Sequence, residues 1–151
     1  MIDIHGEGQG VSRSLSNFTP HRFMFDGVHC SSMEGFLQSL KYKDPNEQSR
    51  VCGLSGWDAK RAGGEQDNVW KHEQTLWWQG ESYDRHGDKY QKLLDRVYRA
   101  LAHQNTDFRE ALLSTGNEIL THKVGKSNPY DTCLTENELC TRLMCIRSEL
   151  Q

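Results

Sequence analysis

The chain has 151 residues, with 18 Lys and Arg against 21 Asp and Glu and a net charge of −3. This length fits one compact domain, residues 1–151, and leaves no room for two ordinary ones. Aromatic residues spread along the chain and a small net charge exclude an intrinsically disordered protein. A protein that binds long nucleic acid by general charge is also excluded, because neutralising phosphates requires a basic chain. A local basic pocket stays compatible with this composition.

The two ends of the sequence and its cysteines are typical of a cytoplasmic protein. The first ten residues lack the basic start and apolar centre of a signal peptide, and no apolar run reaches the roughly 18 residues of a membrane span. The 5 cysteines are irregularly spaced and form no CxxC pair, which favours free thiols over a zinc site. We therefore expect a cytoplasmic protein with no membrane segment.

The first quarter of the chain predicts short elements. Residues 1–14 are rich in Gly and Ser and predict a loop or flexible terminus, with at most one short strand. Residues 23–28 predict a β-hairpin, because the dipeptide Asp26-Gly27 favours a tight turn.

A helix is expected next. Ser31 and Glu34 have the spacing of a capping box, and Pro45 is expected to end the helix. Its apolar stripe, at i, i+3, i+4 and i+7, is Met33, Phe36, Leu37 and Leu40.

The rest of the chain predicts mostly helices. Residues 46–64 predict two short helices broken at Gly53, whereas residues 65–86 give no clear pattern beyond packed tryptophans. The remaining expected elements are a long helix over 87–104 with one buried face, a helix over 106–114 ended by Gly116, a strand over 118–124, a loop over 125–134, and a last helix opened by a capping box of Thr135 and Glu138. The sum is one helix-dominated α+β domain with a small β component.

One group of polar residues can carry chemistry. Glu34, Gln38 and Lys41 are spaced i, i+4, i+7 and share a stripe beside the apolar face of their helix, where a pocket wall would lie. In a second interpretation, Glu34 is only the capping carboxylate and the other two form a solvated flank. Spacing alone favours this second interpretation, because polar flanks are common on amphipathic helices.

A wider resemblance favours the first interpretation. Ser16-Asn17-Phe18, the expected hairpin and a helix reading S-x-E-x-x-x-Q-x-x-K resemble the N-terminal signature of the NADAR family, also called YbiA-like. The resemblance continues in order through residues 59–63, Trp70, residues 99–101, 112–116, 120–122 and 142–147. The segment over 122–132 departs from the family pattern, which carries an Asp, an aromatic-Gly pair and a glycine-rich stretch there.

The resemblance implies an N-glycosidase that cleaves a base or amine from C1 of a ribose, without metal or cofactor. The leading substrate is ADP-ribose attached to guanine in nucleic acid, which implies functional pairing with an ADP-ribosyltransferase as its antitoxin. A second is a phosphoribosyl-amine intermediate of riboflavin synthesis. A third hypothesis is a non-catalytic protein that binds ADP-ribose or a nucleotide. The oligomeric state does not follow from the resemblance.

The chemistry of such a reaction suggests roles for the carboxylate and the amine. Glu34 suits stabilisation of the ribose oxocarbenium ion or deprotonation of the attacking water. Lys41 suits neutralisation of phosphate charge or, as an alternative, covalent attack on C1 of an opened ribose. Gln38 would orient one of them or the ribose hydroxyls.

Further residues are expected to bind the substrate. Asn17 and Phe18 would bind and stack a base or ribose. The family match places Trp70 in the pocket, and Asp131 would replace the acid of the family loop. Two interpretations are open for a group of four basic residues: they form a local basic rim that binds phosphates, or they are ordinary solvated charges. These residues are Arg13, Arg22, Lys123 and Lys126. The histidines have no metal-ligand spacing and are expected to be surface or satisfied residues.

Overall fold

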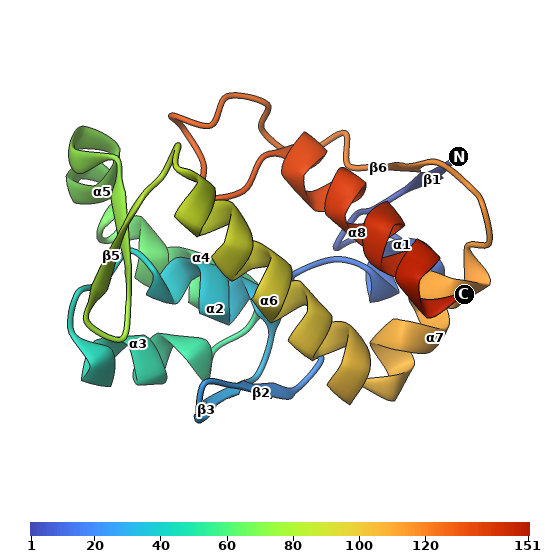
Figure 1. The fold of residues 1–151 in the computed structure, drawn as a ribbon, viewed down its shortest axis with the longest axis horizontal. Helices are drawn as coiled ribbons and strands as arrows, with labels where there is room; N and C mark the ends of the chain where they lie inside the picture. Colours follow the sequence, from blue (N-terminus) through green and yellow to red (C-terminus); the bar gives the residue numbers. More distant parts are fainter.

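The computed structural model describes residues 1–151 as helices packed about one long helix, with strands only in pairs (Figure 1). In chain order the helices are α1 (Val11–Ser14), α2 (Met33–Ser39), α3 (Pro45–Cys52), α4 (Gly56–Gly64), α5 (Asp67–Glu73), α6 (Asp88–Gln104), α7 (Thr106–Ser114) and α8 (Glu136–Leu150). The strands form three two-stranded sheets: β1 (Ile2–Asp3) with β6 (Leu120–Thr121), β2 (Phe23–Phe25) with β3 (Val28–Cys30), and β4 (Thr75–Trp78) with β5 (Glu81–Asp84). The predicted helix-dominated α+β fold with a small β component is confirmed.

Helix α6 lies in the middle of the hydrophobic core, and packs against β2, α7 and α8 (Figure 1). Its bounds agree with the prediction, because its sequence repeats apolar residues at helical spacing and so buries one continuous face. The predicted buried residues are all buried: Tyr90, Leu93, Leu94, Val97, Tyr98 and Leu101.

Helix α2 is buried along its whole length and packs against α3 and α4. The approach to the end of α3 is possible only because Gly35 has no side chain. A Cβ there would lie 2.5 Å from the carbonyl oxygen of Leu54 and 2.9 Å from that of Cys52. The core therefore fixes the position of α2, including its polar side chains.

The ends of α2 differ from the prediction. Ser32, not Ser31, is the N-cap residue, and its hydroxyl accepts a hydrogen bond of 3.0 Å from the Gly35 amide. The helix ends at Ser39, well before Pro45. Pro45 instead begins α3, because a first helical residue needs no N–H partner and Asp44 supplies the cap.

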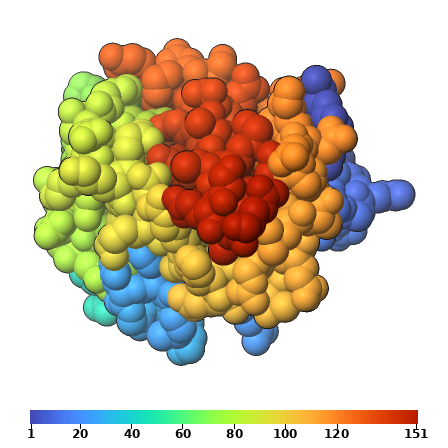
Figure 2. All heavy atoms as spheres, turned by 45° about the vertical axis from the view of Figure 1, so that its right-hand side comes forward, coloured from blue at the N-terminus to red at the C-terminus, as the bar shows by residue number.

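The N-terminal segment is more ordered than its composition predicts. Residues 1–14 contain the expected short strand, β1, which pairs in parallel with β6, and also the one-turn helix α1. The amino group of Met1 forms an ion pair with Glu118, and Figure 2 shows the blue N-terminal segment against the orange residues near 120. The strand expected over 118–124 is only β6, because β1 offers just two residues to pair with.

Other local predictions are confirmed. Asp26 and Gly27 have φ of 47° and 81° in the β2–β3 turn, and Gly116 ends α7 with φ of 59°. Both hydrogen bonds of the Thr135–Glu138 capping box are present. The segment without a clear pattern, 65–86, contains α5 and the β4–β5 hairpin. None of the helices combines the length and the apolar character that crossing a membrane requires.

Candidate functional site

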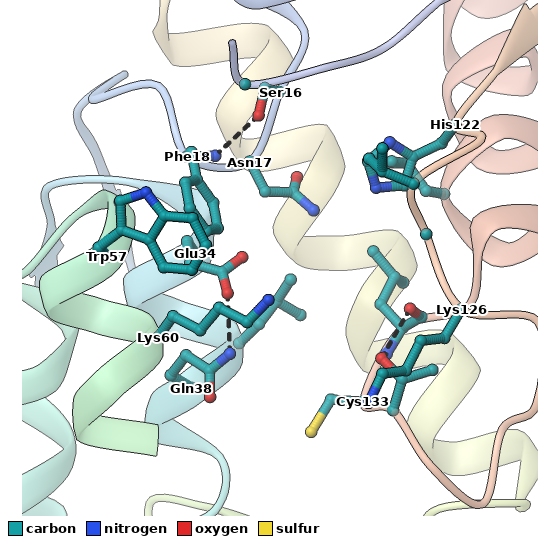
Figure 3. A pocket seen from close by; sticks show the side chains of 18 of the residues that line it. Ser16, Asn17, Phe18, Glu34, Gln38, Trp57, Lys60, His122, Lys126 and Cys133 are labelled. Atoms are coloured by element: carbon teal, nitrogen blue, oxygen red, sulfur yellow. Dashed lines mark hydrogen bonds between the residues drawn. The ribbon is translucent and has the colours of Figure 1, made fainter. Parts of the chain in front are cut away.

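A cleft of about 740 Å³ opens between segments from the two halves of the chain. Residues 5–20, α2, α4 and α5 contribute one side, and residues 122–134 contribute the other. In Figure 3, Glu34, Gln38, Trp57 and Lys60 lie on one wall and face His122, Lys126 and Cys133 on the other. All residues predicted for the site line this cleft: Asn17, Phe18, Glu34, Gln38, Lys41, Trp70 and Asp131.

Glu34 is a buried carboxylate at the cleft, only 9% exposed. It is not the capping residue, because the Ser32 cap contacts Gly35 instead. The Gln38 Nε2 donates a hydrogen bond of 2.8 Å to Glu34 Oε1. Burial raises the pKa of Glu34, while the Gln38 hydrogen bond and the charge of Lys60 oppose that shift. The capping and solvated-flank interpretation of this stripe is therefore wrong.

The Gln38 side chain packs against α4 at a glycine. Gly63 packs directly against the amide, and a Cβ at that position would lie 2.6 Å from Gln38 Cδ. The Gln38 Oε1 is buried and has no hydrogen-bond partner within the protein. This oxygen faces Gly63 of α4 and not the open cleft, so the group that Gln38 presents toward Glu34 is its Nε2.

Lys41 forms an ion pair across the cleft wall with the first residue of α5. Its Nζ lies 2.5 Å from Asp67 Oδ1, and its side chain is 8% exposed. As an ion-paired ammonium, Lys41 supplies a positive charge to the wall. Covalent attack on a ribose carbon would first require this pair to break, so the contacts favour the electrostatic role.

Asn17 connects the loop before the hairpin to two helices. Its backbone carbonyl accepts a hydrogen bond of 3.0 Å from the Glu34 amide, and its Oδ1 accepts one of 2.8 Å from the Tyr98 hydroxyl. These two contacts leave the side-chain amide nitrogen directed into the cleft (Figure 3). Asn17 therefore presents a fixed donor beside Glu34.

Trp70 and Asp131 line the cleft in different ways. Trp70 is 2% exposed, and its Nε1 has no hydrogen-bond partner. Asp131 is exposed at the rim and accepts a hydrogen bond of 3.3 Å from Asn128. Trp70 therefore packs in the core and also lines the cleft, whereas Asp131 is accessible to solvent or to a ligand.

The wall formed by residues 122–134 is anchored from behind by a buried arginine. Arg85 is 1% exposed; it donates to the Thr132 carbonyl at 2.8 Å and forms an ion pair with Glu138. The Tyr90 hydroxyl donates to the Cys133 carbonyl at 2.6 Å. These bonds hold the loop against α6 and α8.

Three residues of the cleft were missed by sequence reasoning. His122 lies on the wall, where its Nδ1 contacts the Ile4 carbonyl at 2.7 Å. Trp57 and Lys60 line the cleft from α4; their i, i+3 spacing is common on surface helices, and the family resemblance over residues 59–63 included Lys60 but not Trp57. Of the suggested basic rim, Arg13 and Lys126 line the cleft, while Arg22 and Lys123 do not.

Comparisons with known proteins agree on one relationship. The family of bacteriophage protein GP30.3 matches residues 10–148. An uncharacterized 17.1 kDa protein in the Gp30–rIII intergenic region of Enterobacteria phage T4 is 33% identical over 150 residues, which cover 99% of this chain and 98% of that protein. The NMR structure of the E. coli protein YbiA matches with a TM-score of 0.62 and 19% identity, covering 95% of this chain and 82% of that chain. The likeness to YbiA shows a shared fold.

Proposed function

The chain belongs to the bacteriophage protein GP30.3 family, a YbiA-like (NADAR) family, and we propose that it is an N-glycosidase acting on an ADP-ribosyl adduct. In this proposal it hydrolyses the bond between ribose C1 and the amino nitrogen of guanine in nucleic acid. The observation that carries the proposal is the buried carboxylate of Glu34, hydrogen-bonded to Gln38 on the wall of a nucleotide-sized cleft.

The reaction needs a carboxylate beside ribose C1. As the C1–N bond breaks, its electron pair leaves with the guanine nitrogen and positive charge develops on the ribose. Ionised Glu34 stabilises that charge, and burial strengthens the interaction because little water screens it. Water then adds to C1 and gives a proton to Glu34, and Glu34 returns one proton to the guanine nitrogen, which completes its amino group and regenerates the carboxylate. The products are free ADP-ribose and unmodified guanine.

The raised pKa of Glu34 suits this role. A general base works best when its pKa approaches the working pH, and burial moves the pKa of Glu34 in that direction. The nearby cations Lys60 and Lys41 favour the ionised form, so the carboxylate is not left as an isolated buried charge.

Other groups on the walls fit the remaining parts of an ADP-ribosyl group. The Asn17 amide nitrogen offers a donor for a ribose hydroxyl. Arg13, Lys60 and Lys126 offer positive charge for the diphosphate, which lets a chain of net charge −3 hold one anionic ligand.

The proposal is tested with a guanine-containing oligonucleotide that carries ADP-ribose, by chromatography of released ADP-ribose. Glu34→Gln keeps the shape and the acceptor for Gln38, so it should fold and lose about 10²- to 10⁴-fold in rate. Glu73→Gln, an exposed carboxylate on α5 outside the cleft, is the matched control and should cleave normally.

Three results would contradict the proposal. A Glu34→Gln variant that cleaves at the wild-type rate removes Glu34 from the mechanism. A wild-type protein that cleaves only phosphoribosyl-amine intermediates of riboflavin synthesis, assayed in parallel, keeps the N-glycosidase class but changes the substrate. Tight binding of ADP-ribose without any turnover would instead support the non-catalytic hypothesis.

A further inference from the structure

Trp57 is the one strongly exposed tryptophan of the chain. It is 57% exposed, whereas Trp70 and Trp78 are each 2% exposed. It lies in the first turn of α4 and lines the cleft. Its position gives little packing to the core, and a large aromatic surface left at the mouth of a cleft is typical of a binding site.

Trp57 makes a corner with Phe18. The ring centroids are 5.2 Å apart and the rings are nearly perpendicular, at 86°. Gly56 has φ of 54°, a conformation that favours glycine, and this residue brings the start of α4 alongside the Phe18 ring. A flat ligand that stacks on one ring therefore meets the second ring at its edge.

Lys60 adds a charge to this corner. Because it lies three residues after Trp57 on the same helix, its Nζ is 5.3 Å from the Trp57 ring and 6.0 Å from the Phe18 ring. The charge of the same amine lowers the pKa of Glu34, so Lys60 lies near both the aromatic corner and the buried carboxylate (Figure 3). A ligand that fits here is flat and aromatic, with negative charge close to its ring.

We propose that Trp57 and Phe18 form a subsite that stacks one nucleobase of the substrate, with Lys60 contacting the phosphate attached to it. The identity of the substrate rests on the proposed function, but the ability of the subsite to bind a base does not. The base has two sources: the adenine of the ADP-ribosyl group, or the base next to the modified guanine in the strand.

Binding measurements test the subsite without any turnover. The probes are ADP-ribose, ribose 5-phosphate and an unmodified single-stranded hexanucleotide, titrated calorimetrically into wild type, Trp57→Ala and Trp57→Phe. Stacking on an aromatic side chain corresponds to about a 5- to 150-fold change in Kd. Trp57→Ala should weaken the binding of at least one base-bearing probe by this factor and leave ribose 5-phosphate unchanged. Trp57→Phe should restore most of the affinity.

Trp77→Phe is the matched control. Trp77 is half-buried in β4, carries Lys43 Nζ 4.7 Å over its ring, and lies outside the cleft. This variant should bind all probes as wild type does. Because Trp57 is exposed, its variants should also keep the wild-type melting temperature, which separates a binding effect from unfolding.

Each outcome decides the proposal. Weaker binding of ADP-ribose identifies adenine as the base, and weaker binding of the hexanucleotide alone identifies a base of the strand. Equal affinities in wild type and Trp57→Ala for every probe overturn the subsite, as does a wild-type protein that binds neither base-bearing probe. The two proposals can fail separately. If the wild-type protein releases no ADP-ribose but Trp57→Ala still weakens the binding of a base-bearing probe, the proposed function is refuted and the subsite is supported.

Discussion

Gly63 gives a direct test of how the site is positioned. A methyl group at this residue would lie 2.6 Å from Gln38 Cδ and 2.9 Å from Gln38 Cβ, whereas unstrained carbons stay at roughly 3.5–4 Å. Gly63→Ala must therefore displace Gln38 by about 1 Å, because both residues are buried and the neighbouring backbone is close-packed. That displacement breaks or lengthens the hydrogen bond to Glu34.

Gly63→Ala should reduce both the stability and the reaction rate, and the size of each loss can be estimated. Overpacking of this kind costs about 1–3 kcal/mol, and the higher helix propensity of alanine returns about 0.5–1 kcal/mol. We expect a net loss of roughly 0–2.5 kcal/mol, which lowers the melting temperature by up to about 10 °C for a chain of this size. Under the proposed catalytic role of Glu34, a displacement of about 1 Å in Gln38, which orients that carboxylate, costs up to about 10²-fold in rate.

Gly64→Ala is the matched control, because the nearest atom to its Cβ is Asp67 Oδ2 at 3.9 Å and the residue is exposed. Gly64→Ala should be as stable as the wild-type protein or up to about 1 kcal/mol more stable, and it should release ADP-ribose at the wild-type rate. Thermal unfolding and the release assay are run on both variants. A Gly63→Ala protein with wild-type stability and rate would show that Gln38 is not held as described.

The remaining predictions concern two buried charged groups. The pKa of Glu34 is raised in the folded state, so its ionisation lowers stability as the pH rises from the unfolded value of about 4.3 through the folded value. Glu34→Gln should therefore be more stable than wild type near pH 7–8, by about 1.4 kcal/mol for each pH unit that separates the folded pKa from the unfolded one. The gain should disappear near pH 4; urea unfolding at both pH values measures it, and a gain that persists at pH 4 contradicts the reasoning. Arg85→Met leaves Glu138, whose side chain is 15% exposed, without its cation and should cost about 3–5 kcal/mol, with faster amide exchange over residues 125–134. Arg99→Met, which breaks the exposed pair with Glu149, should cost at most about 1 kcal/mol, and equal losses for the two arginines would refute the buried role.

The elements that could be predicted are those whose pattern is local. Helix α6 buries a face that is set by its own apolar repeat, and the capping box of α8 needs only four neighbouring residues. The grouping of Glu34 and Gln38 was also local, because one turn of α2 places them together, and Lys41 follows in the turn just after the helix ends. The burial and the contacts of these side chains could not be predicted, since they depend on which of two neighbouring serines caps the helix and on which elements pack over it.

The parts that could not be predicted depend on partners far away in the chain. One short strand was expected within residues 1–14, but the position and the partner of β1 could not be predicted, because two residues are too few for a pattern and the strand forms by pairing with β6. His122 is held at the cleft by a contact between its imidazole and the carbonyl of Ile4, 118 residues earlier. Trp57 is exposed, and exposure of one aromatic residue leaves no periodic trace in a sequence.

The parallel pairing of β1 with β6 has a consequence for biosynthesis. During translation the helix that carries Glu34 leaves the ribosome long before residues 120–134, which complete the facing wall. Contacts of such long sequence separation form late, because the loop they close spans most of the domain. The two walls of the cleft therefore come together only after residues 120–134 have been synthesised and β6 has paired with β1.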